Sequence, residues 1–220
     1  MKKIKQFVVS LLIICMVIAS VPSTKVNAAT ITRSEVSQKL GNLMNQYVGQ
    51  KGNWNYATGS QCYGFAHLIF DNIFNRGEKI VGNGAVSSNS TNYKLNNVAS
   101  DIKTIGTLAP GYTMDQLKNL LNQAAPGDYI QVRRRSSGGP HSMICVSVSA
   151  NNSIEIFDAN SNGDGYVRHY TQSYSEFMNK NSGVSVYRYS DYNAAEAVHN
   201  CADHEGQERW RVTVSSVLNI

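Results

Sequence analysis

The spacing of apolar residues in this 220-residue chain changes from a helical period to a strand period at about residue 128. Before that point apolar side chains recur every three or four residues, which indicates amphipathic helices. After it, short runs alternate between apolar and polar residues, as in half-buried strands. Helices are predicted at 32–48, 60–76, 113–121 and 173–179, and strands at 128–133, 141–149, 153–159, 165–170 and 183–189. Helices followed by consecutive strands favour an α+β fold with an antiparallel sheet.

Polar residues at the helix starts support these boundaries. Thr32 and Thr113 each stand three residues before a Glu or Gln, which is the spacing of a capping box. Ser60 is placed to cap the helix that follows it. Residues 82–110 are rich in Asn, Ser and Gly and show no lasting period, so we expect a long surface excursion there.

Residues 1–28 have the pattern of a secretory signal peptide, with lysines, then an apolar run, then small residues at Ala28 and Ala29. The segment holds four of the 20 basic residues and none of the 15 acidic ones, so the rest of the chain is nearly neutral. The basic pI therefore gives no case for a nucleic-acid partner. We expect a secreted protein without a stable membrane anchor. Residues 29–190 would form one domain, and 191–220 a C-terminal extension to which the sequence assigns no structure.

Three cysteines remain beyond the signal segment, and an odd number leaves at least one free thiol. Cys145 lies in a predicted buried strand, where a free cysteine behaves as a small apolar residue. Cys62 falls in the first turn of the second helix, where exposed amide dipoles stabilise a thiolate. Cys62 is therefore a candidate nucleophile. A disulfide between Cys62 and Cys201 is the alternative.

A nucleophilic thiol needs a base, and His141 is the best placed of the five histidines. It follows the Gly-rich loop SSGGP and begins the apolar strand SMICVSV, so its ring is expected at a sheet edge. The next strand ends in Asp158 and Asn160, which share one side if the strand stays extended. A hairpin between the two strands would bring both residues beside His141, where either can orient the imidazole.

These residues, together with the PGD sequence at 126–128, resemble the CHAP family of cysteine, histidine-dependent amidohydrolases and peptidases. The motifs are also similar to those of the NlpC-type relatives, and both families have a papain-like fold. The resemblance covers about residues 32–190. It implies Cys62 as nucleophile, His141 as general base, and Asn160 with Asp158 orienting the imidazole.

The chain departs from the family pattern at three places. Asp158 replaces the usual Glu, and Pro140 replaces the usual Gly before the histidine. Tyr56 stands where papain-like proteases carry an oxyanion glutamine, while Gln61 adjoins the cysteine. Trp54, Tyr56 and Gln61 are expected to line the substrate groove, although as aromatics Trp54 and Tyr56 suit a core equally well.

The resemblance implies a secreted, monomeric cysteine amidase or endopeptidase that hydrolyses peptidoglycan amide bonds and needs no cofactor or metal. It would act in the peptide stem or cross-bridge, or at the sugar-to-peptide amide. Two further enzyme classes stay open, a secreted protein-directed cysteine protease and a transglutaminase-like or deamidating enzyme. A non-catalytic binding module with the papain-like fold is the alternative outside enzymes.

Three other groups of residues admit a second interpretation. Asn162 and Asp164 could contribute to a calcium site, or form a polar turn between strands. His199, Cys201 and His204 have zinc-binding side chains but no fourth ligand nearby. The arginine run 133–135 could clamp an acidic substrate, or form a solvated strand end.

Overall fold

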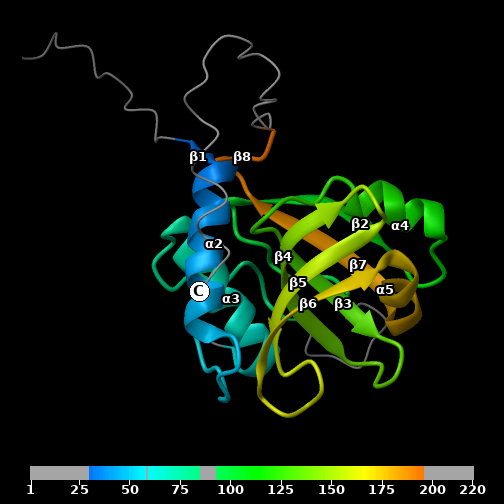
Figure 1. The fold of residues 1–220 in the computed structure, drawn as a ribbon, viewed down its shortest axis with the longest axis horizontal. Helices are drawn as coiled ribbons and strands as arrows, with labels where there is room; N and C mark the ends of the chain where they lie inside the picture. Colours follow the sequence, from blue (N-terminus) through cyan, green and yellow to red (C-terminus); the bar gives the residue numbers. More distant parts are fainter. Residues whose placement is uncertain (1–29, 58, 85–92, 196–220) are drawn as a thin grey trace, which may run out of the picture. The chain divides into compact units, whose positions relative to one another are not determined.

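The computed structural model describes residues 30–57, 59–84 and 93–195 (Figure 1). The predicted signal peptide, residues 1–28, lies outside the described residues, as do His199, Cys201 and His204. The zinc interpretation and the Cys62–Cys201 disulfide therefore stay predictions. Within the described part of the chain, no helix is both long enough and apolar enough to cross a bilayer.

The described chain has an α+β fold in which most strands follow the first three helices. Its helices are α2 (Arg33–Tyr47), α3 (Gln61–Phe74), α4 (Met114–Leu121) and α5 (Tyr174–Lys180). Its strands are β1 (Ile31–Thr32), β2 (Ile102–Leu108), β3 (Tyr129–Arg134), β4 (Pro140–Ser149), β5 (Ser153–Ala159), β6 (Val167–Ser173), β7 (Asn181–Tyr189) and β8 (Tyr192–Asn193). Each predicted helix and strand is confirmed, with ends that differ by a few residues.

The predicted caps are confirmed at two of three helices. Thr32 and Thr113 accept a hydrogen bond from the third helical amide, and the Glu or Gln side chain at that position bonds back to the cap. Ser60 is the N-cap residue of α3, but its side chain makes no capping hydrogen bond. The first turn of α3 therefore keeps amide groups that no cap side chain satisfies.

Six strands form one antiparallel sheet in the order β2-β7-β3-β4-β5-β6. β2 occupies one edge of the sheet and corrects the sequence prediction for residues 82–110, which we expected to be a surface excursion throughout. Strand β4 lies inside the sheet, between β3 and β5, and His141 is the second residue of this strand. The backbone of His141 is paired with Val132 of β3, while the pairing with β5 begins at Ile144.

The two faces of the sheet carry different helices and separate apolar cores (Figure 1). On β5, Phe157 and Ala159 pack with α2 and α3, whereas Ile154 and Ile156 pack with α4 and α5. Asp158 continues the alternation of Ile154 and Ile156, so its side chain leaves the sheet on the face that α4 and α5 cover. The helix that carries Cys62 packs on the opposite face.

Candidate active site

Cys62 lies half-buried in the first turn of α3, as the sequence predicts, and it forms no disulfide among the described residues. Gln61, directly before it, has a left-handed backbone with φ +53°. Two residues after Cys62, Gly64 lets the helix approach the preceding loop, because a Cβ there would lie 2.8 Å from the carbonyl oxygen of Gly59. The loop and the helix start are therefore packed too closely for a larger residue at this position.

His141 and Asp158 form a buried pair on neighbouring strands. The Nε2 atom of His141 lies 2.7 Å from Oδ2 of Asp158, and the two residues are 2% and 0% exposed. The β4–β5 hairpin predicted from sequence produces this contact, since Ile144 of β4 lies opposite Phe157 of β5. An ionised carboxylate can only accept, so Nε2 carries a proton and Nδ1 is left to face the thiol.

The thiol of Cys62 lies close enough to the imidazole of His141 that each group changes the pKa of the other. Burial raises the pKa of Cys62, but the hydrogen bond and positive charge of His141 outweigh it, so the pKa falls below its ordinary value. Burial lowers the pKa of His141, but hydrogen bonds to Asp158 and Cys62 outweigh it and raise that pKa. Both shifts favour the thiolate–imidazolium pair.

Tyr170 of β6 is a member of this cluster that the sequence analysis missed. Its hydroxyl donates to Oδ2 of Asp158 at 2.7 Å, so one carboxylate oxygen accepts from both His141 and Tyr170. The other oxygen, Oδ1, is buried and has no hydrogen-bond partner in the described part of the chain. Burial and the Asp158 charge raise the pKa of Tyr170, which keeps its hydroxyl protonated as a donor.

Asn160 lies near the cluster but bonds to other residues. Its Nδ2 donates to Oε1 of Gln61 at 2.9 Å, and its Oδ1 accepts from the backbone amide of Gly165 at 2.8 Å. Among the described residues no hydrogen bond joins Asn160 to His141. The contact to the imidazole is made by Asp158, and Asn160 instead connects the residue before Cys62 to the loop between β5 and β6.

The side chains predicted to line the groove have partners within the fold. The indole Nε1 of Trp54 donates to the carbonyl of Gly165 at 2.8 Å, and its ring packs edge-on against Phe65. The hydroxyl of Tyr56 donates to Asp71 at 3.1 Å. Both aromatic residues hold the loop before α3 in place, and their contact with substrate stays a prediction, as does that of Gln61.

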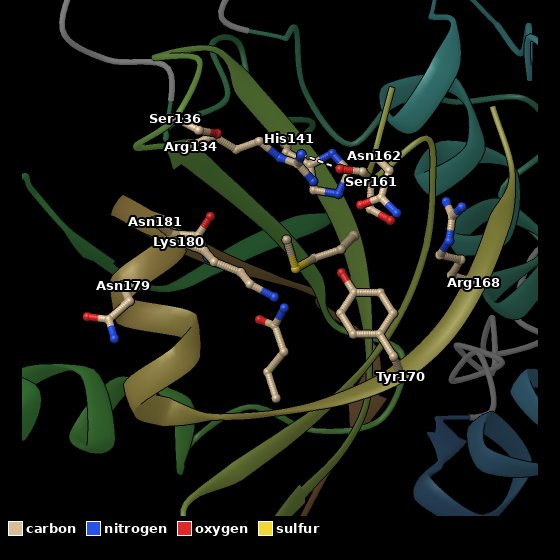
Figure 2. A pocket seen from close by; sticks show the side chains of 12 residues that line it. Arg134, Ser136, His141, Ser161, Asn162, Arg168, Tyr170, Asn179, Lys180 and Asn181 are labelled. Atoms are coloured by element: carbon tan, nitrogen blue, oxygen red, sulfur yellow. Dashed lines mark hydrogen bonds between the residues drawn. The ribbon is translucent and has the colours of Figure 1, made fainter. Parts of the chain in front are cut away.

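A cavity of about 480 Å³ adjoins His141 on the face of the sheet that α5 covers (Figure 2). Arg134, Arg168, Lys180 and Tyr170 are among the residues that line it. Figure 2 shows the hydroxyl end of Tyr170 directed toward His141, and the Lys180 side chain extending into the cavity from the end of α5. Cys62 is not among the lining residues.

The carboxylate predicted to bind calcium in the β5–β6 loop is already paired with an arginine. Asp164 forms an ion pair with Arg168, and the hydrogen bond to Arg168 lowers the Asp164 pKa to about 2. Among the described residues, no three His, Cys, Asp or Glu side chains are grouped as metal ligands would be. Asp164 serves instead to position a cavity-lining arginine.

No model of a known protein family matches this chain, and no curated protein sequence matches it. Among solved structures, the crystal structure of Ly7917 has a TM-score of 0.43 and 14% identity, covering 70% of this chain and 61% of that one. Ly7917 with the hydrolyzing product of MDP has a TM-score of 0.41 and 13% identity, covering 70% and 62%. The X-ray crystal structure of PlyC has a TM-score of 0.41 and 17% identity, covering 69% and 35%. This chain spans less than two thirds of each.

Proposed function

We propose that this chain is a papain-like cysteine hydrolase that cleaves amide bonds, with Cys62 as nucleophile and His141 as general base. The observation that carries the proposal is the buried pair of His141 and Asp158, joined by a hydrogen bond of 2.7 Å, with the Cys62 thiol near enough to the imidazole that each changes the pKa of the other. A thiol, an imidazole and a carboxylate in this order are the components of nucleophilic acyl transfer.

In the acylation step His141 takes the thiol proton and the Cys62 sulfur attacks the carbonyl carbon of the amide. The carbon–oxygen double bond becomes a single bond, and the resulting oxyanion lies near the amide groups of the first turn of α3. Ser60 leaves these amides without a side-chain acceptor, so they are available to the oxyanion. The tetrahedral intermediate then expels the amine, which takes the proton from the imidazolium of His141.

Water completes the reaction by hydrolysing the thioester. His141 accepts a proton from the water as its oxygen attacks the acyl carbon, and the proton returns to the sulfur as the carboxylic acid leaves. Asp158 supports the imidazolium in both steps, because its negative charge lies 2.7 Å from Nε2 in a site without solvent. Tyr170 holds the carboxylate oxygen in this position.

For the substrate we propose peptidoglycan, on the strength of the CHAP-like motifs around Cys62, His141 and Asp158. The amide bond would lie in the peptide stem, in the cross-bridge, or between sugar and peptide. The signal-like segment 1–28 agrees with an enzyme that acts outside the cell. A protein-directed protease would use the same three side chains, and the substrate assay separates the two.

The test compares the protein with its Cys62→Ser variant on purified cell walls and on denatured protein substrates. We expect the unchanged protein to clear the walls with release of new amino groups, and Cys62→Ser to lose this activity at least about 10³-fold. Alkylation by iodoacetamide across pH gives a second measurement, with an inflection below the ordinary thiol pKa of 9.0. Equal clearing by both forms would refute the role of Cys62, and cleavage of protein substrates alone would favour the protease.

A further inference from the structure

The cavity beside His141 is basic, and the hydrolase mechanism above does not use its cations. Three of the residues that line the cavity are cationic, namely Arg134, Arg168 and Lys180. No Asp or Glu is among its lining residues. Two carboxylates contact lining residues: Asp158 is enclosed behind His141 and Tyr170, and Asp164 is paired with Arg168. An anion that enters the cavity therefore meets positive charge.

Two of these cations have little to neutralise them. Arg168 is paired with Asp164, whereas Arg134 donates only to the carbonyl oxygen of Ser161 and has no carboxylate partner among the described residues. The ammonium of Lys180 forms no hydrogen bond or ion pair with another described residue, and its charge interacts at longer range with Glu176, one turn earlier in α5. Lys180 and Arg134 come from different elements, α5 and β3, and both side chains line the same cavity (Figure 2).

A buried amide provides an independent sign of a ligand site. Gln172 of β6 is only 7% exposed and lines the cavity, and its side-chain amide makes no hydrogen bond within the described part of the chain. The amide atoms of Gln172 are not among the fully enclosed polar atoms without a partner, so they open onto the cavity, where a ligand or water can bond them. The volume of about 480 Å³ falls within the range of small-molecule sites.

The proposed mechanism indicates which part of the substrate would enter this cavity. In the proposed mechanism the acyl group becomes attached to the Cys62 sulfur, while His141 delivers its proton to the departing amine. The amine must therefore come within hydrogen-bond reach of the imidazole. The cavity is lined by His141 but not by Cys62, so a leaving group that takes its proton from His141 can extend into it.

We propose that this cavity binds a carboxylate on the leaving-group side of the substrate, through Lys180 and Arg134, with Gln172 bonding a neighbouring peptide group. The inference rests on the proposed function, because that function defines which part of the substrate departs as the amine. The carboxylate can be a free C-terminus or an acidic side chain, and both present the same planar anion to a guanidinium and an ammonium.

Titration of the full-length protein with product-like amines, followed by NMR, tests the cavity without relying on turnover. The probes are two matched pairs: alanyl-alanine and its C-terminal amide, and glutamic acid α-amide and glutamine α-amide. We expect at least one carboxylate probe to bind about tenfold more tightly than its neutral partner. Preference for alanyl-alanine identifies a terminal carboxylate, and preference for glutamic acid α-amide identifies a side-chain carboxylate.

Lys180→Met is the informative variant, and Lys118→Met is its matched control, because each lysine lies in the last turn of a short helix. We expect Lys180→Met to reduce the carboxylate preference at least about fivefold, while Lys118→Met leaves it unchanged. Equal binding of charged and neutral probes, absence of binding by all four, or an unaffected preference in Lys180→Met would overturn the proposal. Carboxylate binding by a protein that hydrolyses neither walls nor protein substrates supports the cavity but refutes the hydrolase, and hydrolysis without carboxylate binding does the reverse.

Discussion

The replacement of Asp158 by Asn tests the proposed mechanism most directly, because it removes a charge and leaves the shape of the side chain nearly unchanged. Asp158 and His141 are 0% and 2% exposed, so solvent screens their interaction weakly. Opposite unit charges about 4 Å apart at an effective dielectric constant of about 20 interact by about 4 kcal/mol. If the imidazolium forms in the transition state, Asp158→Asn should slow wall hydrolysis roughly 10³-fold.

The same substitution should change the reactivity of Cys62. Loss of the carboxylate removes a hydrogen bond that raises the pKa of His141, so the imidazolium that stabilises the thiolate becomes less favourable. The pH inflection of Cys62 alkylation should therefore move upward, toward the ordinary thiol pKa of 9.0. Wall clearing and iodoacetamide labelling measured on the same preparation give the two values.

Glu155→Gln is the matched control, since Glu155 also lies on β5 and bonds a histidine, His169, at 2.8 Å. That pair is partly exposed, and the thiol that Glu155 influences is the buried Cys145 and not Cys62, so we expect its loss to change the rate less than about twofold. An Asp158→Asn enzyme within threefold of the unchanged protein, or a Glu155→Gln enzyme equally impaired, would refute the role assigned to Asp158.

Three further predictions follow from other parts of the structure. Asn160→Ala should reduce wall hydrolysis about tenfold without moving the alkylation inflection of Cys62, because Asn160 bonds Gln61 and not the imidazole; a shifted inflection would contradict this. Gly64→Ala should lower the free energy of unfolding, measured by urea titration, by at least about 2 kcal/mol, because the added Cβ would meet backbone carbonyls. The control is Gly41→Ala in α2, where an added Cβ meets nothing within 4 Å, and it should be neutral or stabilising. Equal effects of the two substitutions would contradict this reasoning. Burial lowers the pKa of His67 from 6.5 to about 4, so the unfolded chain binds more protons between these values, and stability should fall as pH drops through this window, by about 3 kcal/mol from His67 alone. Urea titrations at pH 7 and 4.5 should show a smaller fall for His67→Gln, and an unchanged fall would exclude His67 as the cause.

The hydrophobic period predicts the elements well where one face of each is buried and the other is polar. β5 was predicted with its observed ends, because Ile154 and Ile156 alternate with more polar residues up to the turn. β2 was missed because it lies at the edge of the sheet and presents Lys103 and Thr104 to solvent within a segment rich in Asn and Ser. Its pairing with β7 is a tertiary contact that the local sequence does not specify.

Tyr170 escaped the sequence analysis for a similar reason. Its role depends on the register between β5 and β6, which places Arg168 opposite Asp158 and Tyr170 opposite Ile156. Tyr170 is therefore a diagonal neighbour of Asp158 on the same face, within reach of a long side chain. The register between β5 and β6 would have identified Tyr170 as a neighbour of Asp158, but this register is known only from the folded structure.

The choice between Asp158 and Asn160 shows where the alternation rule stops. Residues two apart share a face only while the chain between them is extended. β5 ends at Ala159, and Asn160 has a left-handed backbone with φ +59°, so its side chain leaves the direction that Asp158 follows. Asp158 therefore reaches the imidazole of His141, while Asn160 reaches Gln61 beside the thiol. The end of β5 thus positions both partners of the proposed reaction: Asp158 holds the base, His141, and Asn160 holds Gln61, the residue before the nucleophile. The two side chains point in different directions because the backbone bends at Asn160, and the alternation of residues in the sequence does not predict this bend.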